Sequence, residues 1–85
     1  MKKVTIYTKD FCPYCIKAIN LLERKKADYQ EINLTNDPEK LEKLKNETNF
    51  YTVPQIFIGN EFIGGCDDLY DLEKKGELDK KLLEK

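Results

Sequence analysis

Residues 4–24 of the chain have the sequence VTIYTKDFCPYCIKAINLLER, and the hydrophobic pattern changes near the middle of this stretch. Residues 4–7 are β-branched or aromatic, which predicts a short strand. From Pro13 onward the apolar residues follow a helical spacing. Proline suits the first turn of a helix, because the N–H that it lacks would have no partner there. The apolar stripe expected on this helix carries Ile16, Ile19, Leu22 and Lys26.

The next two elements are expected at residues 29–34 and from residue 37 onward. The segment 29–34 has the sequence YQEINL and predicts a second strand. Asp37 followed by Pro38 indicates a helix start, with the aspartate as N-cap and the proline in the first turn. The inner face of this helix is expected to carry Leu41, Leu44 and Thr48.

Residues 51–65 predict a β-hairpin that is followed by a break. Residues 51–58 are apolar enough for a central strand, and Gly59-Asn60 is a two-residue turn signal before a partner strand at 61–63. The pair Gly64-Gly65 is expected to end that strand.

A final helix is expected after the glycine pair. Either Asp67 or Asp68 can cap it, and Gly76 is expected to close it. A short helical tail is predicted at residues 78–83, and the apolar residues of the final helix itself are Leu69 and Leu72.

The predicted order of elements is β-α-β-α-β-β-α with a helical tail. The first βαβ unit requires parallel strands joined by a right-handed crossover, and the later hairpin adds antiparallel strands. A four-stranded mixed β-sheet flanked by helices fits this order, which is an α/β fold of the thioredoxin-like type. At 85 residues the chain is expected to be one domain, spanning residues 1–85.

Composition narrows the possible functions. The 15 Lys+Arg and 16 Asp+Glu give a net charge of -1, so the basic excess expected of a nucleic-acid binder is missing. No apolar stretch reaches the ~18–20 residues of a membrane span, and no signal-peptide core is evident at the start. We therefore expect a cytoplasmic protein with neither nucleic-acid nor membrane partners. Without histidine, the chain cannot build a Cys–His pair, a Ser–His pair or a Cys₂His₂ zinc site.

The motif Cys12-Pro13-Tyr14-Cys15 lies where the first strand gives way to the first helix. A Cys-x-x-Cys pair beside a βαβ pattern indicates a redox dithiol. The unpaired amides and dipole of a helix N-terminus favour a thiolate at Cys12, and Lys9 adds positive charge nearby. Cys15 is expected to be less exposed. Two other interpretations are half of a zinc site, for which only Cys66 remains as a thiol, and a pair of inert buried cysteines.

Two further segments carry candidate binding residues. The segment Thr52-Val53-Pro54 has two interpretations. In the first, the proline simply marks the start of a strand. In the second, a cis peptide turns the Val53 backbone towards the dithiol, where it can pair with an extended peptide. The segment 64–68, GGCDD, is either a turn before a capped helix or a ligand site. In the second case, helix-start amides hold a carboxylate and an aspartate accepts from an ammonium group.

In order and spacing, the three motifs CPYC, TVPQIFI and GGCDD resemble those of dithiol glutaredoxins, over nearly the whole chain. The resemblance implies glutathione-dependent thiol–disulfide exchange, with Cys12 as nucleophile and Cys15 as resolving thiol. It also implies glutathione as co-substrate, no metal, and a monomer acting on disulfide-bonded or glutathionylated proteins such as ribonucleotide reductase. The glutathione-binding residues that it implies are Lys9, Tyr14, Thr52, Val53, Pro54, Gly65, Cys66 and Asp67.

The chain departs from the family pattern at one place. Many members carry a basic residue just before Thr-Val-Pro, where it contacts the glycyl carboxylate of glutathione, but this chain has Asn49-Phe50-Tyr51. Lys9 is then the remaining cation for that carboxylate. Cys66 is expected to be a small turn residue whose backbone N–H is used; the alternative is an exposed thiol open to oxidation or glutathionylation.

Two other functions remain open at this point. One is a redoxin of the same fold that thioredoxin reductase reduces and that serves ribonucleotide reductase; such proteins typically lack the Gly-Gly-x-Asp turn seen at residues 64–67. The other is a non-enzymatic homodimer that bridges a [2Fe–2S] cluster through Cys12 and two glutathiones. That behaviour goes mainly with a glycine after the first cysteine, where this chain has Pro13.

Overall fold

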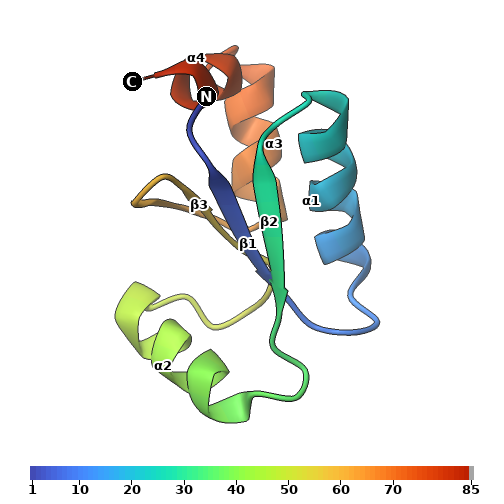
Figure 1. Cartoon of the computed structure of the whole chain (residues 1–85), viewed down its shortest axis with the longest axis vertical. Coiled ribbons are helices and arrows are strands. Elements are labelled where there is room, and N and C mark those ends of the chain that lie inside the picture. Colours follow the sequence, from blue (N-terminus) through green and yellow to red (C-terminus); the bar gives the residue numbers. More distant parts are fainter. Residues whose placement is uncertain (85) are drawn as a thin grey trace.

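The computed structural model describes residues 1–84. Strands and helices alternate along this range with short connections, and the segment 12–15 lies at the start of the first helix (Figure 1). The elements are β1 (Val4–Thr8), α1 (Pro13–Arg24), β2 (Tyr29–Asn33), α2 (Pro38–Thr48), β3 (Gln55–Ile58), β4 (Glu61–Gly64), α3 (Cys66–Lys74) and α4 (Leu78–Leu83).

The strands form one mixed sheet in the order β2-β1-β3-β4. β1 pairs with β2 in parallel, and Val4 lies opposite Tyr29. β1 also pairs with β3, and β3 with β4, in antiparallel fashion. The predicted thioredoxin-like arrangement of a four-stranded mixed sheet with flanking helices is therefore confirmed.

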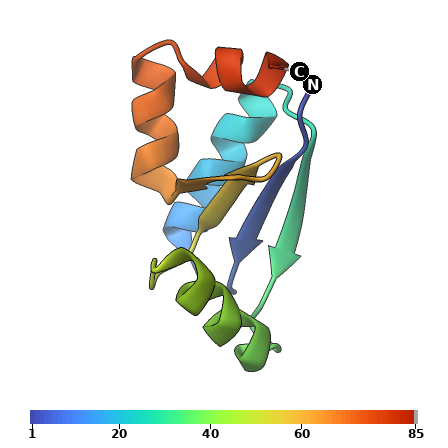
Figure 2. The same cartoon turned by 90° about the vertical axis from the view of Figure 1, so that its left-hand side faces the viewer.

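The helices cover both faces of the sheet. α1 and α3 lie on one face and α2 lies on the other, while α4 closes the end near both termini (Figures 1 and 2). Burying apolar surface, at roughly 25 cal/mol per Å², is the main force that holds these layers together. The larger core includes Val4, Ile6, Ala18, Leu22, Ile56, Ile58, Leu69, Leu78 and Leu82, and the smaller core under α2 is formed by Leu34, Leu41 and Leu44. None of the helices within residues 1–84 is long and apolar enough to cross a membrane.

The buried face of α1 agrees with the prediction at Leu22, which is buried, and at Ile19, which is partly buried against the larger core, but it differs at the other two positions. Ile16 is 60% exposed, and Lys26 lies beyond the helix, which ends at Arg24. The buried residues of the helix are Cys15, Ala18, Leu21 and Leu22. The prediction followed the large apolar side chains, whereas the helix also buries the two small residues Cys15 and Ala18. Small residues let a helix pack closely against its neighbours. A prediction that follows only the large apolar residues overlooks such positions.

The start of α2 agrees with the sequence. Asp37 is the N-cap, and its carboxylate accepts the Lys40 N–H at 3.2 Å. Leu41 and Leu44 are buried as expected, and Thr48 is partly buried at the last turn.

Two predicted boundaries were wrong. The N-cap of α3 is Gly65, so neither Asp67 nor Asp68 is the N-cap; Asp68 instead caps the helix from its first turn, where its carboxylate accepts the Gly65 N–H. The strand predicted at 51–58 begins only at Gln55, because residues 51–54 form a loop with a cis peptide bond between Val53 and Pro54. Proline has no N–H for a strand ladder, which agrees with its place just outside the strand.

Candidate active site

The dithiol lies at the junction of β1 and α1. Cys12 is the N-cap of α1, and Cys15 lies one turn inside the helix with its Cα 5.2 Å from that of Cys12. The two sulfurs are joined as a disulfide, and the Cys15 backbone N–H donates to Cys12 Sγ at 3.2 Å. Cys12 is partly exposed whereas Cys15 is only 2% exposed. An incoming disulfide therefore reaches Cys12 first.

The loop before Cys12 is held by side chains from the end of β2. The Asp10 backbone N–H donates to Thr35 Oγ1 at 2.7 Å, and Asn33 Nδ2 donates to the Asp10 carboxylate at 2.9 Å. Phe11, which directly precedes the cysteine, has a left-handed φ of 56° and a fully exposed side chain. An aromatic residue adopts that backbone conformation only where its surroundings impose it. The anchored loop therefore fixes the position of Cys12.

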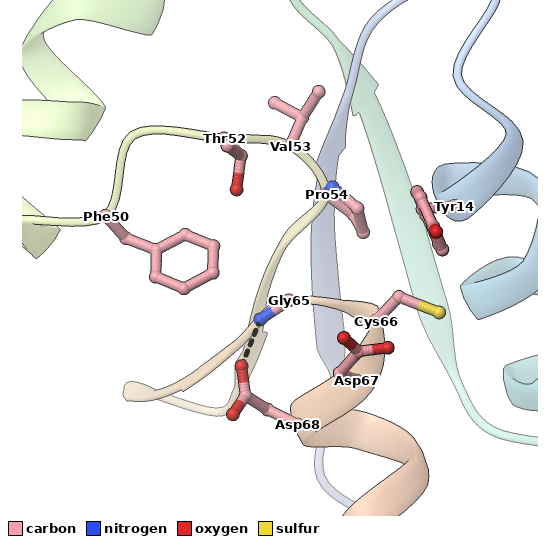
Figure 3. Close-up of a pocket in the computed structure, with 9 residues that line it drawn as sticks. All are labelled: Tyr14, Phe50, Thr52, Val53, Pro54, Gly65, Cys66, Asp67 and Asp68. Carbon is pink, nitrogen blue, oxygen red and sulfur yellow. Dashed lines mark hydrogen bonds between the residues drawn. The ribbon is translucent and has the colours of Figure 1, made fainter.

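An open groove of about 570 Å³ lies beside the dithiol. This volume is within the range of small-molecule sites, ~300–1,000 Å³. Three parts of the chain contribute: the first turn of α1, the loop before β3 and the start of α3 (Figure 3). Its lining residues are Tyr14, Phe50, Thr52, Val53, Pro54, Gly65, Cys66, Asp67 and Asp68.

The cis peptide connects the dithiol to the groove. Val53 precedes Pro54 in the cis conformation, and the Val53 carbonyl oxygen lies 3.9 Å from Cys12 Sγ. A carbonyl this close to the partly exposed sulfur leaves the Val53 backbone beside any chain that is bonded to Cys12. This edge can therefore form backbone hydrogen bonds to an extended peptide.

The other end of the groove is the N-terminus of α3. The carboxylate of Asp68 accepts the Gly65 N–H at 2.9 Å (Figure 3). The next two amides, those of Cys66 and Asp67, lie in the first turn, where N–H groups have no acceptor within the helix. A helix N-terminus with free amides suits a carboxylate, and the Asp67 side chain supplies a negative charge beside it for an ammonium group.

Gly64 lies beside the Asp68 side chain, and its backbone conformation and close contact with that side chain both favour glycine. It has a φ of 119°, and a Cβ placed on it would lie 2.7 Å from the Cγ of Asp68. We expect Gly64→Ala to lower the free energy of unfolding by several kcal/mol, since it adds a steric clash to an unfavourable backbone angle. Gly76→Ala is the matched control, because Gly76 also has a positive φ, of 72°, but has open space around it. Chemical denaturation measures both, and equal losses would contradict the clash.

Cys66 is buried, contrary to the alternative that treated it as an exposed thiol. It begins α3, is 4% exposed and packs into the larger core. Burial raises the pKa of the Cys66 thiol; Lys17 lowers it and Asp67 raises it, each by a smaller amount. A buried thiol with a raised pKa is a poor nucleophile.

We expect Cys66 in the reduced, folded protein to resist alkylation at pH 7.5 while Cys12 reacts. Because the folded state holds the Cys66 proton more tightly than the unfolded state, this cysteine contributes stability that is lost as pH rises above about 9. Mass spectrometry after timed iodoacetamide treatment measures the order of labelling. Labelling of Cys66 as fast as Cys12 below pH 8 would contradict the burial.

The structure brings together all but one of the candidate binding residues that the family resemblance implied. Lys9 is exposed and does not line the groove. Phe50 and Asp68 line the groove but were not predicted to bind; the sequence marked Phe50 only by its lack of charge and Asp68 only as a helix cap. The residues that do come together are Tyr14, Thr52, Val53, Pro54, Gly65, Cys66 and Asp67.

Comparison with known proteins identifies the family. The glutaredoxin family model matches residues 4–63. The chain belongs to the glutaredoxin family. It is 51% identical over 79 residues to a glutaredoxin of Pseudomonas aeruginosa, which covers 93% of this chain and 94% of that protein. It is 47% identical over 79 residues to glutaredoxin 3 of Escherichia coli strain K12, covering 93% of this chain and 95% of that protein.

Solved glutaredoxins share the whole fold. The solution structure of a Brucella melitensis glutaredoxin has a TM-score of 0.87 and 48% identity, covering 96% of this chain and 89% of that one. A buckwheat glutaredoxin, crystallised as a glutathione complex, has a TM-score of 0.91 and 32% identity, covering 95% of this chain and 76% of that one. With its Cys12–Cys15 pair, this glutaredoxin is a thiol–disulfide oxidoreductase.

Proposed function

We propose that this glutaredoxin uses glutathione, and that it reduces protein–glutathione mixed disulfides and protein disulfides through Cys12 and Cys15. The observation that carries the proposal is the groove that begins at the Val53 backbone, 3.9 Å from the Cys12 sulfur, and ends at the free amides of α3. A bound γ-glutamyl-cysteinyl chain can use the peptide edge at one end and the helix N-terminus at the other. The glutathione complex of the buckwheat relative agrees with this assignment.

The ends of glutathione have different partners in this proposal. The γ-glutamyl end carries both a carboxylate and an ammonium group, which match the amides of Cys66 and Asp67 and the Asp67 side chain. The lining of the groove, as described for residues 1–84, contains two carboxylates and no lysine or arginine. The glycyl carboxylate therefore depends on Lys9 outside the lining, and we expect the γ-glutamyl end to dominate recognition.

The reaction begins when the Cys12 thiolate attacks the glutathione sulfur of a mixed disulfide. A bond forms between Cys12 and glutathione, the original disulfide breaks and the protein leaves as a thiolate that takes up a proton. A second glutathione, as thiolate, then attacks the same glutathione sulfur and releases oxidised glutathione and Cys12. The helix N-terminus at Cys12 favours the thiolate at each stage.

Protein disulfides require the second cysteine. Cys12 attacks one sulfur of the substrate and forms a mixed disulfide with it, and the Cys15 thiolate then attacks Cys12 and releases the reduced protein. The Cys12–Cys15 disulfide that results is the state seen in the structure. Glutaredoxins have potentials of about −200 to −230 mV, so a cytoplasmic glutathione pool can reduce this disulfide again.

Two reducing systems compared side by side test the proposal. In the first system the oxidised protein is mixed with glutathione, glutathione reductase and NADPH, and in the second with thioredoxin reductase and NADPH. The substrate is a small glutathione mixed disulfide or a disulfide-bonded protein such as oxidised ribonucleotide reductase. Consumption of NADPH measures turnover in each system. We expect turnover in the first system alone. Turnover only with thioredoxin reductase would overturn the proposal in favour of a dedicated redoxin, and a brown dimer on anaerobic purification would favour the cluster-bridging role over a monomeric enzyme.

A further inference from the structure

Gln55, the first residue of β3, has a completely buried side chain that the chemistry above does not use. Buried amides are costly unless they are hydrogen-bonded. This one donates through Nε2 to the carbonyl oxygens of Phe50 and Thr52, the latter at 3.3 Å, and accepts through Oε1 from the Thr48 hydroxyl at 2.9 Å. All of its bonds are to residues 48–52, the segment that joins α2 to the cis peptide.

The orientation of the amide follows from its partners. Two carbonyl oxygens can only accept, so the nitrogen of Gln55 faces them and its oxygen faces Thr48. The Thr48 hydroxyl also accepts the Phe50 N–H at 3.3 Å. One buried side chain therefore ties the last turn of α2 to both ends of the stretch 50–52. No strand ladder holds that stretch, because β3 begins only at Gln55.

The residues that Gln55 holds are the ones that shape the groove. Phe50 and Thr52 line it, and Thr52 directly precedes Val53, whose carbonyl faces Cys12. The ring of Phe50 also lies against Gly65, where an added Cβ would be 3.1 Å from its Cζ. The stretch 50–53 therefore contacts both ends of the groove, and its position sets the shape of the groove wall (Figure 3).

We propose that Gln55 is a positioning residue for substrate recognition: its carboxamide sets the stretch 50–53 so that the groove recognises the glutathionyl half of a mixed disulfide. This inference rests on the proposed function. It places the control of specificity in a side chain that touches neither the substrate nor either reactive sulfur. Glutamate in this place presents acceptors to two carbonyls, and leucine leaves both carbonyls buried without a donor.

The test uses one fluorescent peptide in two forms, joined through a disulfide either to glutathione or to cysteine. The reduced protein reacts with each form in a single turnover, so no recycling system is involved, and peptide release is measured against protein concentration. We expect the wild-type protein to prefer the glutathione form. Gln55→Leu and Gln55→Glu are expected to reduce this preference about tenfold by raising the concentration needed for half-maximal rate, with the limiting rate little changed.

Two controls separate positioning from general destabilisation. Ile58→Val alters the same strand at a buried position in the larger core, away from the segment 48–52, and we expect it to keep the preference. The rate of Cys12 alkylation by iodoacetamide should be unchanged in all variants, because that reagent does not use the groove. Thr48→Val keeps the shape of the side chain but removes the hydroxyl that bonds Gln55 Oε1, the Phe50 N–H and the Leu44 carbonyl oxygen. Because both bonds from Gln55 Nε2 remain, this variant is expected to lower the preference by a smaller factor, and it replaces the Gln55 variants in the test if they do not fold.

The outcomes distinguish the two proposals. A wild-type protein that releases both peptides equally contradicts the glutathione groove itself, and with it the role of Gln55. A wild-type preference that survives in the Gln55 and Thr48 variants, or that Ile58→Val lowers as much, overturns the positioning role alone. Slower Cys12 alkylation in the Gln55 variants would also overturn it, because the defect would then lie at the sulfur.

Discussion

Replacing Cys12 with serine is expected to abolish reduction of every disulfide substrate, to the rate of buffer alone. The substitution removes the sulfur that is partly exposed, lies at the N-cap of α1 and is 3.9 Å from the Val53 carbonyl. A serine hydroxyl is not ionised near neutral pH and forms no disulfide, so neither step of the exchange is available. Glutathione-coupled NADPH consumption with a small mixed disulfide measures the loss.

Loss of activity in Cys12→Ser identifies the nucleophile only if this variant still folds. Serine is close in size to cysteine and can accept the same Cys15 N–H as an N-cap, so we expect α1 and the free energy of unfolding to be nearly unchanged. Ile16→Ser is the matched control, since it places the same residue in the same helix at a side chain that is 60% exposed and outside the groove. It should retain activity, and full activity in Cys12→Ser would show that another group is the nucleophile.

Local sequence patterns were sufficient for the sheet and for the dithiol. The β-branched run at residues 4–7, the helix start at Pro13 and the Asp37 N-cap each express a preference of neighbouring residues, and all three elements form as expected. The position of Cys12 follows from the same preferences, because a strand that ends before a helix begins leaves the cysteine at the N-cap.

Features that depend on packing between distant segments were harder to predict. Ile16 is exposed because α1 is buried on the side that carries Cys15 and Ala18. The spacing of apolar residues within α1 does not by itself predict which side of the helix is buried. Cys66 is buried because α3 packs on α1, although its local sequence resembles an exposed turn. A polar residue such as Gln55 gives no sign of burial until residues 48–52 are seen to meet its carboxamide.

Replacing Cys15 with serine is expected to separate the two reactions of the active site. Reduction of a glutathione mixed disulfide should persist, because attack by Cys12 and release by a second glutathione use no other sulfur. Reduction of a protein disulfide should fall to near zero, because the mixed disulfide between Cys12 and the substrate then has no resolving thiol. Cys15 is 2% exposed, so an outside disulfide reaches it poorly and it acts only on a partner already bonded to Cys12.

Paired assays on one preparation of Cys15→Ser measure this separation, one with a glutathionylated peptide and one with a disulfide-bonded protein. The trapped intermediate is the more direct evidence: mass spectrometry should find the protein substrate covalently bound to Cys12. We expect excess glutathione to release that adduct slowly, so that the block is kinetic. Equal loss of both activities would mean that the buried Cys15 side chain supports Cys12 through packing, and that the two sulfurs do not divide the reaction between them.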